Sequence, residues 1–511
     1  MAMPGEEDLQ PPSGTAMSVA TTIMGALIGL GGIAWGADLY RMVGWNFLAE
    51  QFLAVVLGLA MGIIFLIKPL ISSSGPTRAS APWYDWVLSL GSVALGVYLS
   101  WHYPRMLGEF FNSPMDVVVC CSLLFVLVVE GLRRASGWAL VIVVLAFFAY
   151  ALAGHMVGGA LQTREVNLSG LLVYLGLDSS GLFGLVLLIG VTVVIPFVFF
   201  GQLLASSGGA NFFNDISIGL MGRFRGGAAK ISILASSLFG SINGIVVSNI
   251  LATGVVTIPM MKRSGFPAKF AAGVEAAAST GGALMPPIMG AGAFVMAGYT
   301  NLPYSQIVAV SVLPALLYFL TVAYFVRIEA IRLGLGTMTL ETSEPMRTVL
   351  KQGWQFVLPL GVLIGSLVLG YSALLAAIFA ILATIAASWL SPTPMSAKDC
   401  MDATIDGVQN TTTTALLLVA VGLIINVVTT TGLGNSFSMM IVEWAQGSLL
   451  ITLVLVALAS HVLAWLLALI TMVPIVGPLL VKVLSLSIIW LLNAIGLIDK
   501  IDAIADIVSC K

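Results

Sequence analysis

The sequence predicts an all-α polytopic membrane protein, and three features of its composition support that fold class. The chain has 511 residues, of which 59% are hydrophobic and only 9% are charged. Soluble domains carry about 25% charged residues, and no soluble fold of this length could bury so much apolar surface. The apolar residues fall in blocks of roughly 20, the length of a helix that crosses a bilayer. Because these blocks do not alternate polar and apolar residues, they predict helices rather than barrel strands.

We expect about 12–14 hydrophobic segments, some of which need not cross the bilayer completely. They cover residues 17–37, 47–71, 84–101, 115–132, 137–155, 182–205, 228–261, 268–298, 304–328, 353–370, 372–390, 411–430, 448–470 and 472–497. Two stretches that mix charged and apolar residues, 211–226 and 396–409, precede hydrophobic blocks. They predict amphipathic helices that lie at the membrane surface.

The distribution of basic residues predicts a cytoplasmic N-terminus. Residues 1–16 contain three acidic residues and no Lys or Arg, so block 16–36 is expected to be a retained span rather than a cleaved signal. The second, fourth and sixth loops carry seven Lys or Arg residues, and the first, third and fifth carry three. The positive-inside rule assigns the richer set to the cytoplasm.

The sequence offers no constellation for catalysis. It contains no HExxH, GxSxG or CxxC motif and no Walker loop, which argues that the chain is not an enzyme and hydrolyses no ATP itself. The four cysteines, Cys120, Cys121, Cys400 and Cys510, lack metal-ligand spacing. A net charge of -2 suggests no nucleic-acid partner.

Residues 240–261 are too rich in glycine, asparagine and hydroxyl groups for a plain spanning helix, and they predict a re-entrant hairpin. In such a hairpin, unwound carbonyls and helix C-termini attract cations, whereas helix N-termini attract anions. Sodium prefers oxygen ligands, which the side chains of Ser241, Asn243, Ser248, Asn249 and Thr253 and the main chain of Gly240 and Gly244 can supply. The alternative is a glycine-rich face that packs two helices together.

Residues 268–298 predict a broken helix, because Pro286 and Pro287 cannot continue a regular helix. We expect the break near residues 280–287, which include Thr280, Gly281 and Gly282. Upstream, Glu275 and Ser279 are four residues apart and share a face. A carboxylate inside a span is a functional hypothesis by default, as part of a sodium or substrate site. The alternative is structural: the carboxylate is hydrogen-bonded to the hairpin or lies at the interface beside Lys269.

The same local order occurs twice in the chain. Residues 206–212 read Ser-Ser-Gly-Gly-Ala-Asn-Phe, and residues 430–437 read Thr-Thr-Gly-Leu-Gly-Asn-Ser-Phe. Each run follows one apolar span and precedes another. Paired segments of this kind indicate a transporter built from structural repeats, and a chance similarity of two span ends is the alternative.

The region 240–290 resembles the large subunit of tripartite ATP-independent periplasmic (TRAP) transporters. The matching runs are Gly-Ser-Ile-Asn-Gly at 240–244, Thr-Ile-Pro-Met-Met-Lys-Arg-Ser-Gly-Phe at 257–266, Gly-Val-Glu-Ala-Ala-Ala-Ser-Thr-Gly-Gly at 273–282 and Met-Pro-Pro-Ile-Met-Gly at 285–290. Two upstream runs, Pro-Trp-Tyr-Asp-Trp at 82–86 and Glu-Gly-Leu-Arg-Arg-Ala-Ser-Gly-Trp at 130–138, resemble the fused form. In that form a small four-helix subunit is joined to the large one.

The resemblance implies an elevator-type carrier of the bacterial inner membrane, built from inverted repeats. Sodium is the implied coupling ion, with no other cofactor, and a periplasmic substrate-binding protein, often of the TAXI type, delivers a small organic acid of the C4-dicarboxylate kind. The implied parts are a cytoplasmic tail over 1–16, small-subunit-like helices over 17–155, a first half of the core over 156–345 and a second half over 346–511. By motif match, Ser241, Asn243, Gly244 and Asn249 fall in the first sodium-site hairpin, and residues 279–287 fall in the broken helix beside it.

The sequence departs from the family pattern in two places. The family hairpin commonly reads Gly-Ser-x-Ser-Gly-Ser, but Asn243 and Ile245 replace two of its hydroxyl residues here. A second glycine-rich hairpin is expected near 464–483, where Gly477 is the single glycine, and no later Pro-Pro follows. The second repeat is therefore expected to be incomplete, in a chain that is truncated, frame-shifted or divergent or that needs a second polypeptide. An alternative function is a docking or assembly subunit that does not transport by itself.

Overall fold

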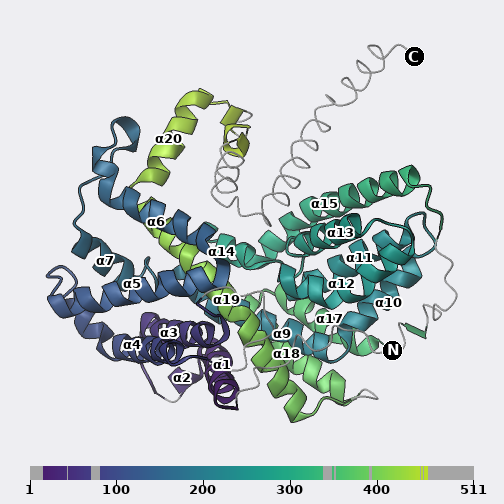
Figure 1. Cartoon of the computed structure of the whole chain (residues 1–511), viewed down its shortest axis with the longest axis horizontal. Coiled ribbons are helices and arrows are strands. Elements are labelled where there is room, and N and C mark those ends of the chain that lie inside the picture. The colour runs from purple at the N-terminus through teal and green to yellow at the C-terminus, as the bar shows by residue number, and fades with distance from the viewer. Residues whose placement is uncertain are drawn as a thin grey trace. The chain divides into compact units, whose positions relative to one another are not determined.

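A computed structural model of the chain describes residues 15–42, 44–70, 81–337, 348–349, 353–390, 394–448, 451–452 and 454–458 (Figure 1). The predicted all-α polytopic fold class is confirmed. In these ranges the chain is built of helices and turns, with one isolated β-bridge between Arg225 and Thr337. The expected second hairpin near 464–483 and the segment 472–497 lie outside the described residues.

Most helices coincide with a predicted apolar block, but residues 168–177 form a helix that lies in none of them. Their bounds are α1 Thr15–Gly36, α2 Leu39–Met42, α3 Ala49–Ile67, α4 Trp83–Gly108, α5 Met115–Ser136, α6 Trp138–Ala153, η2 Gly154–Met156, η3 Gly159–Leu161, α7 Leu168–Leu177, α8 Leu185–Ile189, η4 Gly190–Val194, α9 Ile195–Ser206, α10 Gly209–Met221, α11 Gly227–Asn243, α12 Val246–Arg263, α13 Ala268–Gly282, α14 Ala291–Thr300, α15 Tyr304–Arg332, α17 Trp354–Val368, α18 Ala373–Trp389, α19 Ala397–Thr430 and α20 Leu433–Ala445.

Within the described part of the chain, seven helical stretches are long and apolar enough to cross a membrane. They are Ala16–Gly36, Ala49–Ile67, Met115–Ser136, Trp138–Met156, Leu185–Ser206, Tyr304–Arg332 and Thr412–Thr430. The predicted blocks 228–261 and 268–298 are not among them, because each is divided into two helices, α11 with α12 and α13 with α14. Glycine, asparagine and proline within these blocks interrupt the helix.

The chain divides into two compact units. One contains residues 1–109 and 177–419, and the other contains residues 110–176 and 420–511. In the first unit α11, α12, α13 and α15 lie side by side (Figure 1). Their common core contains small residues, among them Ala228, Ala229, Ala271 and Ala278, each at most 1% exposed. Small side chains let membrane helices approach closely, which brings the polar groups of these helices together.

The two repeated runs adopt the same local structure. Gly208 has φ +99° and precedes the 13-residue helix α10, and Gly432 has φ +73° and precedes the 13-residue helix α20. Both glycines adopt the left-handed region that glycine favours. Each follows a helical stretch long enough to cross a membrane, Leu185–Ser206 or Thr412–Thr430, and precedes a shorter helix. The similarity therefore extends from the residues to the backbone.

The expectation of a separate surface helix over 396–409 is wrong. Residues 397–430 form one helix, α19, with no break before the predicted span at 411. A capping box starts it: the Ser396 backbone N–H donates to the Asp399 carboxylate at 2.8 Å, and the Asp399 N–H donates to Ser396 Oγ at 3.2 Å. No proline follows to interrupt the helix, so the polar first turns continue into the apolar ones.

This cap predicts a pH-dependent start of α19. The backbone N–H and then the hydroxyl of Ser396 hold the pKa of the exposed Asp399 carboxyl below its usual value. A lowered pKa means that the cap stabilises the helix above the unfolded-state pKa and is lost as pH falls through the folded-state pKa. Asp399→Asn should therefore speed amide exchange over residues 397–401 at neutral pH. In the unmutated chain, acidification should produce the same effect after correction for intrinsic exchange rates.

The matched control is Asp402→Asn, an exposed carboxyl one turn further on, which should leave exchange over these residues unchanged. Equal exchange in Asp399→Asn and the unmutated chain at neutral pH would contradict the capping role.

Candidate functional site

The segment 240–249 breaks at Gly244. Helix α11 ends at Asn243, Gly244 adopts φ +65°, Ile245 is extended, and α12 begins at Val246. The Gly244 N–H donates to the Gly240 carbonyl at 2.9 Å, which closes the last turn of α11. A Cβ on Gly244 would lie 2.1 Å from the Met289 carbonyl oxygen. Both the left-handed backbone and the close neighbour therefore require glycine at this turn.

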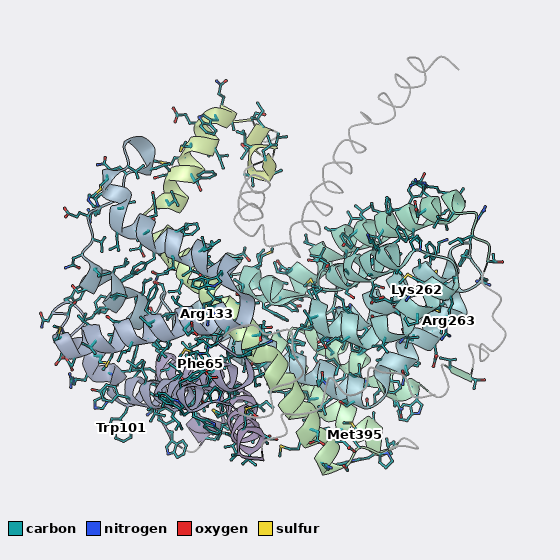
Figure 2. All side chains as sticks on the ribbon, in the orientation of Figure 1. Phe65, Trp101, Arg133, Lys262, Arg263 and Met395 are labelled. Carbon is teal, nitrogen blue, oxygen red and sulfur yellow. The ribbon has the colours of Figure 1, made fainter. Side chains whose placement is uncertain are left out.

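The two helices form an antiparallel hairpin. The Ser236 and Thr253 hydroxyls lie 3.0 Å apart, and Asn249 Nδ2 donates to the Ser236 carbonyl at 2.9 Å. Near the turn, Asn243 Nδ2 donates to Ser248 Oγ at 2.6 Å. Farther from the turn, residues with lower numbers on α11 pair with residues with higher numbers on α12. This is the pattern of two antiparallel helices. Lys262 and Arg263 lie together in the last turn of α12, at the end opposite to Gly244 (Figure 2).

The second break follows α13. This helix ends at Gly282, and α14 begins only at Ala291, with a cis peptide bond between Pro286 and Pro287. The intervening loop is tied to the hairpin, because the Ile288 N–H donates to the Ser241 carbonyl at 3.0 Å. The Tyr304 hydroxyl donates to the Pro287 carbonyl at 3.0 Å and also contacts the Ile288 carbonyl. The predicted break near 280–287 thus lies beside the hairpin turn.

Four helix ends meet at these two loops. The C-termini of α11 and α13 come together: a Cβ on Gly240 would lie 2.5 Å from the Gly282 Cα. The N-termini of α12 and α14 lie at the same end, since Gly244 packs against Met289 and Gly290. Helix C-termini carry partial negative charge and N-termini partial positive charge. The arrangement can therefore attract a cation at one pair of ends and an anion at the other.

Asn249 stands out at this junction. Its side chain is 1% exposed, and its Nδ2 is used in the bond to Ser236. Its Oδ1 is buried and has no hydrogen-bond partner among the described residues. Buried side-chain oxygens are nearly always paired, so this oxygen is a candidate ligand for a group bound at the junction. An amide oxygen is a suitable ligand for a hard cation such as sodium.

Glu275 forms the centre of a second polar cluster, inside the helices. Its side chain is fully buried, with 0% exposure. Its carboxylate accepts hydrogen bonds from five hydroxyls: Ser232 at 2.7 Å, Ser236 at 2.8 Å, Thr253 at 2.6 Å, Thr257 at 2.5 Å and Ser279 at 3.3 Å. Four of these hydroxyls come from the hairpin. The sequence predicts either a sodium or substrate site at Glu275 or a structural role in which Glu275 is hydrogen-bonded to the hairpin. The geometry shows the hydrogen bonds that the structural role requires.

The structure gathers most of the predicted site residues, but not all of them, at the junction. Those at the two loops are Gly240, Ser241, Asn243, Gly244, Ser248, Asn249, Gly282, Pro286 and Pro287. Thr253, Glu275 and Ser279 lie in the carboxylate cluster instead. Thr280 donates to its own helix at Ala276, and Gly281 faces Tyr318 of α15.

The contact between Gly240 and Gly282 is also the glycine-rich packing face that we considered as the alternative to an ion site. Main-chain atoms of the two residues touch, because neither carries a side chain. Close packing and an ion site are therefore compatible here, since the contact is what brings the ends of α11 and α13 together.

Sequence reasoning missed four residues of the site: Ser232, Ser236, Thr257 and Tyr304. The first three were detectable from a spacing of four residues. Ser232, Ser236 and Gly240 follow this spacing on α11, and Asn249, Thr253 and Thr257 follow it on α12, so each set lies on one helix face. Tyr304 carries no such signal, because its role depends on how α15 packs against the loop after Pro287.

In the described part of the chain, no group of three or more His, Cys, Asp or Glu residues could hold a metal ion. The groups at the junction are amide, hydroxyl and main-chain oxygens, which suit a hard, weakly held cation better than a transition metal. An all-α polytopic membrane protein with two adjoining broken helices has the architecture of a membrane transport permease.

Comparison with known proteins identifies the family. The family described as "Tripartite ATP-independent periplasmic transporter, DctM component" matches residues 123–490. The chain belongs to this family, which confirms the resemblance seen in residues 240–290. The family is a transporter permease and not an enzyme.

Individual relatives match over shorter stretches. A C4-dicarboxylate TRAP transporter large permease protein of Vibrio cholerae is 33% identical over 129 residues, 24% of this chain and 27% of the relative. The protein of the same name in Pseudomonas aeruginosa is 32% identical over 27% of this chain and 32% of the relative. The 2,3-diketo-L-gulonate TRAP transporter large permease protein of Escherichia coli is 26% identical over 33% of this chain and 39% of the relative. The chain thus spans between 27% and 39% of the length of these relatives.

The hairpin turn can be tested by Gly244→Ala. A β-carbon at positive φ costs about 1–2 kcal/mol, and here it would also collide with the Met289 carbonyl. We expect a loss of about 2 kcal/mol or more in the free energy of unfolding, measured on the purified protein in detergent micelles.

The control for that substitution is Gly292→Ala in α14, where an added Cβ meets nothing within 4 Å. It should leave stability unchanged or slightly raised. Equal unfolding midpoints for the two variants would show that the turn at Gly244 is not as described.

Proposed function

We propose that the chain is the membrane permease of a sodium-coupled, binding-protein-dependent TRAP-type transporter for small organic acids of the C4-dicarboxylate kind. The observation that carries the proposal is the unpaired, buried Asn249 Oδ1 beside the joined ends of α11 and α13. A cation bound there supplies the partner that this oxygen lacks. It also lies next to the partial negative charge of two helix C-termini.

Sodium is the cation that best fits this donor set. It takes oxygen ligands, and the junction offers the Asn249 amide oxygen, the Ser241 hydroxyl and nearby main-chain carbonyls. The Ser241 hydroxyl donates its proton to the Leu238 carbonyl at 2.7 Å, which leaves its oxygen lone pairs available. The family commonly has a serine at the position of Asn243. The Asn243 amide nitrogen donates to Ser248, so this side chain stabilises the turn.

An organic anion is the substrate that complements this site. The N-termini of α12 and α14 present backbone N–H groups at the same junction, and such ends bind carboxylates without a basic side chain. The relatives are named for a C4-dicarboxylate and for 2,3-diketo-L-gulonate, both small organic anions. Sodium and the anion bind at neighbouring helix ends, so both favour the same conformational state of the permease. Coupled transport requires this.

The remaining parts of the proposal concern the setting of the permease. A periplasmic substrate-binding protein delivers the anion, and the chain lies in the bacterial inner membrane with its N-terminus in the cytoplasm, as the loop charges indicate. The family match continues to residue 490 and so includes most of the second half. This match does not favour the alternative of a docking subunit that transports nothing.

Asn249→Ala tests the sodium site. Losing one ligand should raise the sodium concentration for half-maximal thermal stabilisation of the purified protein about tenfold. In proteoliposomes supplied with the binding protein, uptake of radiolabelled succinate should fall at limiting sodium. Choline should neither stabilise the purified protein nor support uptake in place of sodium.

Val247→Ala is the control for this variant, because Val247 lies on the exposed face of the same helix. It should behave as the unmutated chain does. If Asn249→Ala leaves both the sodium titration and uptake at limiting sodium unchanged, Asn249 is not a ligand.

A further inference from the structure

The Glu275 carboxylate joins three helices through two layers of hydrogen bonds. Oε2 accepts from Ser232 of α11 and Thr257 of α12, at 2.7 and 2.5 Å. Oε1 accepts from Ser236 of α11 and Thr253 of α12, at 2.8 and 2.6 Å. Each oxygen therefore bridges both arms of the hairpin to α13. Ser279 adds a longer bond from the same helix as Glu275.

The cluster is closed to solvent. Glu275, Ser232, Ser236, Thr253 and Thr257 are all 0% exposed. Helix α12 approaches closely because Gly254 faces the glutamate, and a Cβ there would lie 3.2 Å from Glu275 Cγ. Bonds in such an enclosed site are stronger than in water, and losing one leaves a buried group unpaired.

No basic side chain of the described residues pairs with this carboxylate. On α11, Lys230 lies over the Phe224 ring instead, with 5.3 Å between its Nζ and the ring centroid. On α15, the Tyr318 hydroxyl donates to the Ala277 carbonyl. The hydroxyl groups are thus the hydrogen-bond partners of the buried carboxyl group, and a polar group is tolerated in such a place only when it is well hydrogen-bonded.

The cluster is connected directly to Asn249. The Ser236 residue that donates to Glu275 also accepts, through its carbonyl, the bond from Asn249 Nδ2. The Thr253 hydroxyl lies 2.8 Å from the Asn249 carbonyl as well as 2.6 Å from Glu275 Oε1. Because the Thr253 hydroxyl has a single proton, its bond to Glu275 competes with the one to the Asn249 carbonyl. The firm link between Glu275 and Asn249 therefore runs through Ser236.

We propose that Glu275 is a positioning residue that locks the hairpin arms to α13 and so fixes Asn249 Oδ1 at the ends of α11 and α13. The inference rests on the proposed function in treating this oxygen as a sodium ligand. The carboxyl group of Glu275 offers an acceptor oxygen to each layer of hydroxyls. Glutamine offers one oxygen and one NH₂ group, so the hydroxyls of one layer must turn from donors into acceptors and give up the hydrogen-bond geometry that they have with the carboxyl group.

The first test is a sodium titration of thermal stability with Glu275→Gln in the full chain. The sodium concentration for half-maximal stabilisation should rise about tenfold. Thr257→Val, which removes one hydroxyl and keeps the carboxylate, should shift it in the same direction, and Thr257→Ser should restore it. Ser237→Ala is the matched control, because this hydroxyl donates to its own helix at Leu234 and should change nothing.

The second test needs no ion. In sodium-free buffer, amide exchange over residues 240–249 should be faster in Glu275→Gln and Thr257→Val than in the unmutated chain and Ser237→Ala. Unchanged exchange in both variants would overturn the proposal, as would lowered overall stability with an unchanged sodium titration. A third outcome separates the two proposals: the unmutated chain shows no response to sodium, but amide exchange is faster in both variants as expected. The positioning role of Glu275 is then supported, and the proposed sodium coupling is contradicted.

Discussion

Two helices, α11 and α13, end side by side in the protein interior, and the rest of the site depends on that constraint. A helix end leaves several backbone groups without partners, and a buried end must find them nearby. Here each loop provides partners for the other. The Ile288 N–H donates to the Ser241 carbonyl, and Met289 packs against Gly244. The two breaks therefore form a single structure, in which each loop provides contacts for the other.

The same constraint explains why a largely apolar protein keeps a row of polar residues, here called the polar seam, along the contact between α11, α12 and α13. Ser232, Ser236 and Gly240 recur every four residues on α11, and Asn249, Thr253 and Thr257 do so on α12, so each helix turns one edge without large apolar side chains inward. The outer edge of α12 is apolar, with Val247, Leu251 and Val255 exposed. The seam meets Glu275 in the middle and Asn249 at the loop. One continuous set of hydrogen bonds therefore holds the helices together and also reaches Asn249, the residue of the proposed sodium site.

The sequence predicted the parts of this site that depend on local chemistry. Glycine, asparagine and paired prolines set the positions of both breaks, and most of the apolar blocks form helices. The partners of Glu275 could not be predicted, because they depend on which faces of α11, α12 and α13 meet. The start of α19 differs from the prediction, because charged residues occur in the first turns of a long helix as well as in a surface helix. The capping box at Ser396 and Asp399 begins a helix that continues into the apolar span.

The decisive measurement is a density map of the purified protein in sodium buffer, at a resolution that shows bound ions. We expect α11 to end at Asn243 and an ion to contact Asn249 Oδ1, with the ion absent from a matched map in choline. An uninterrupted helix through residues 240–249 would contradict this expectation. So would an Asn249 Oδ1 that is bonded to a protein donor while sodium is present.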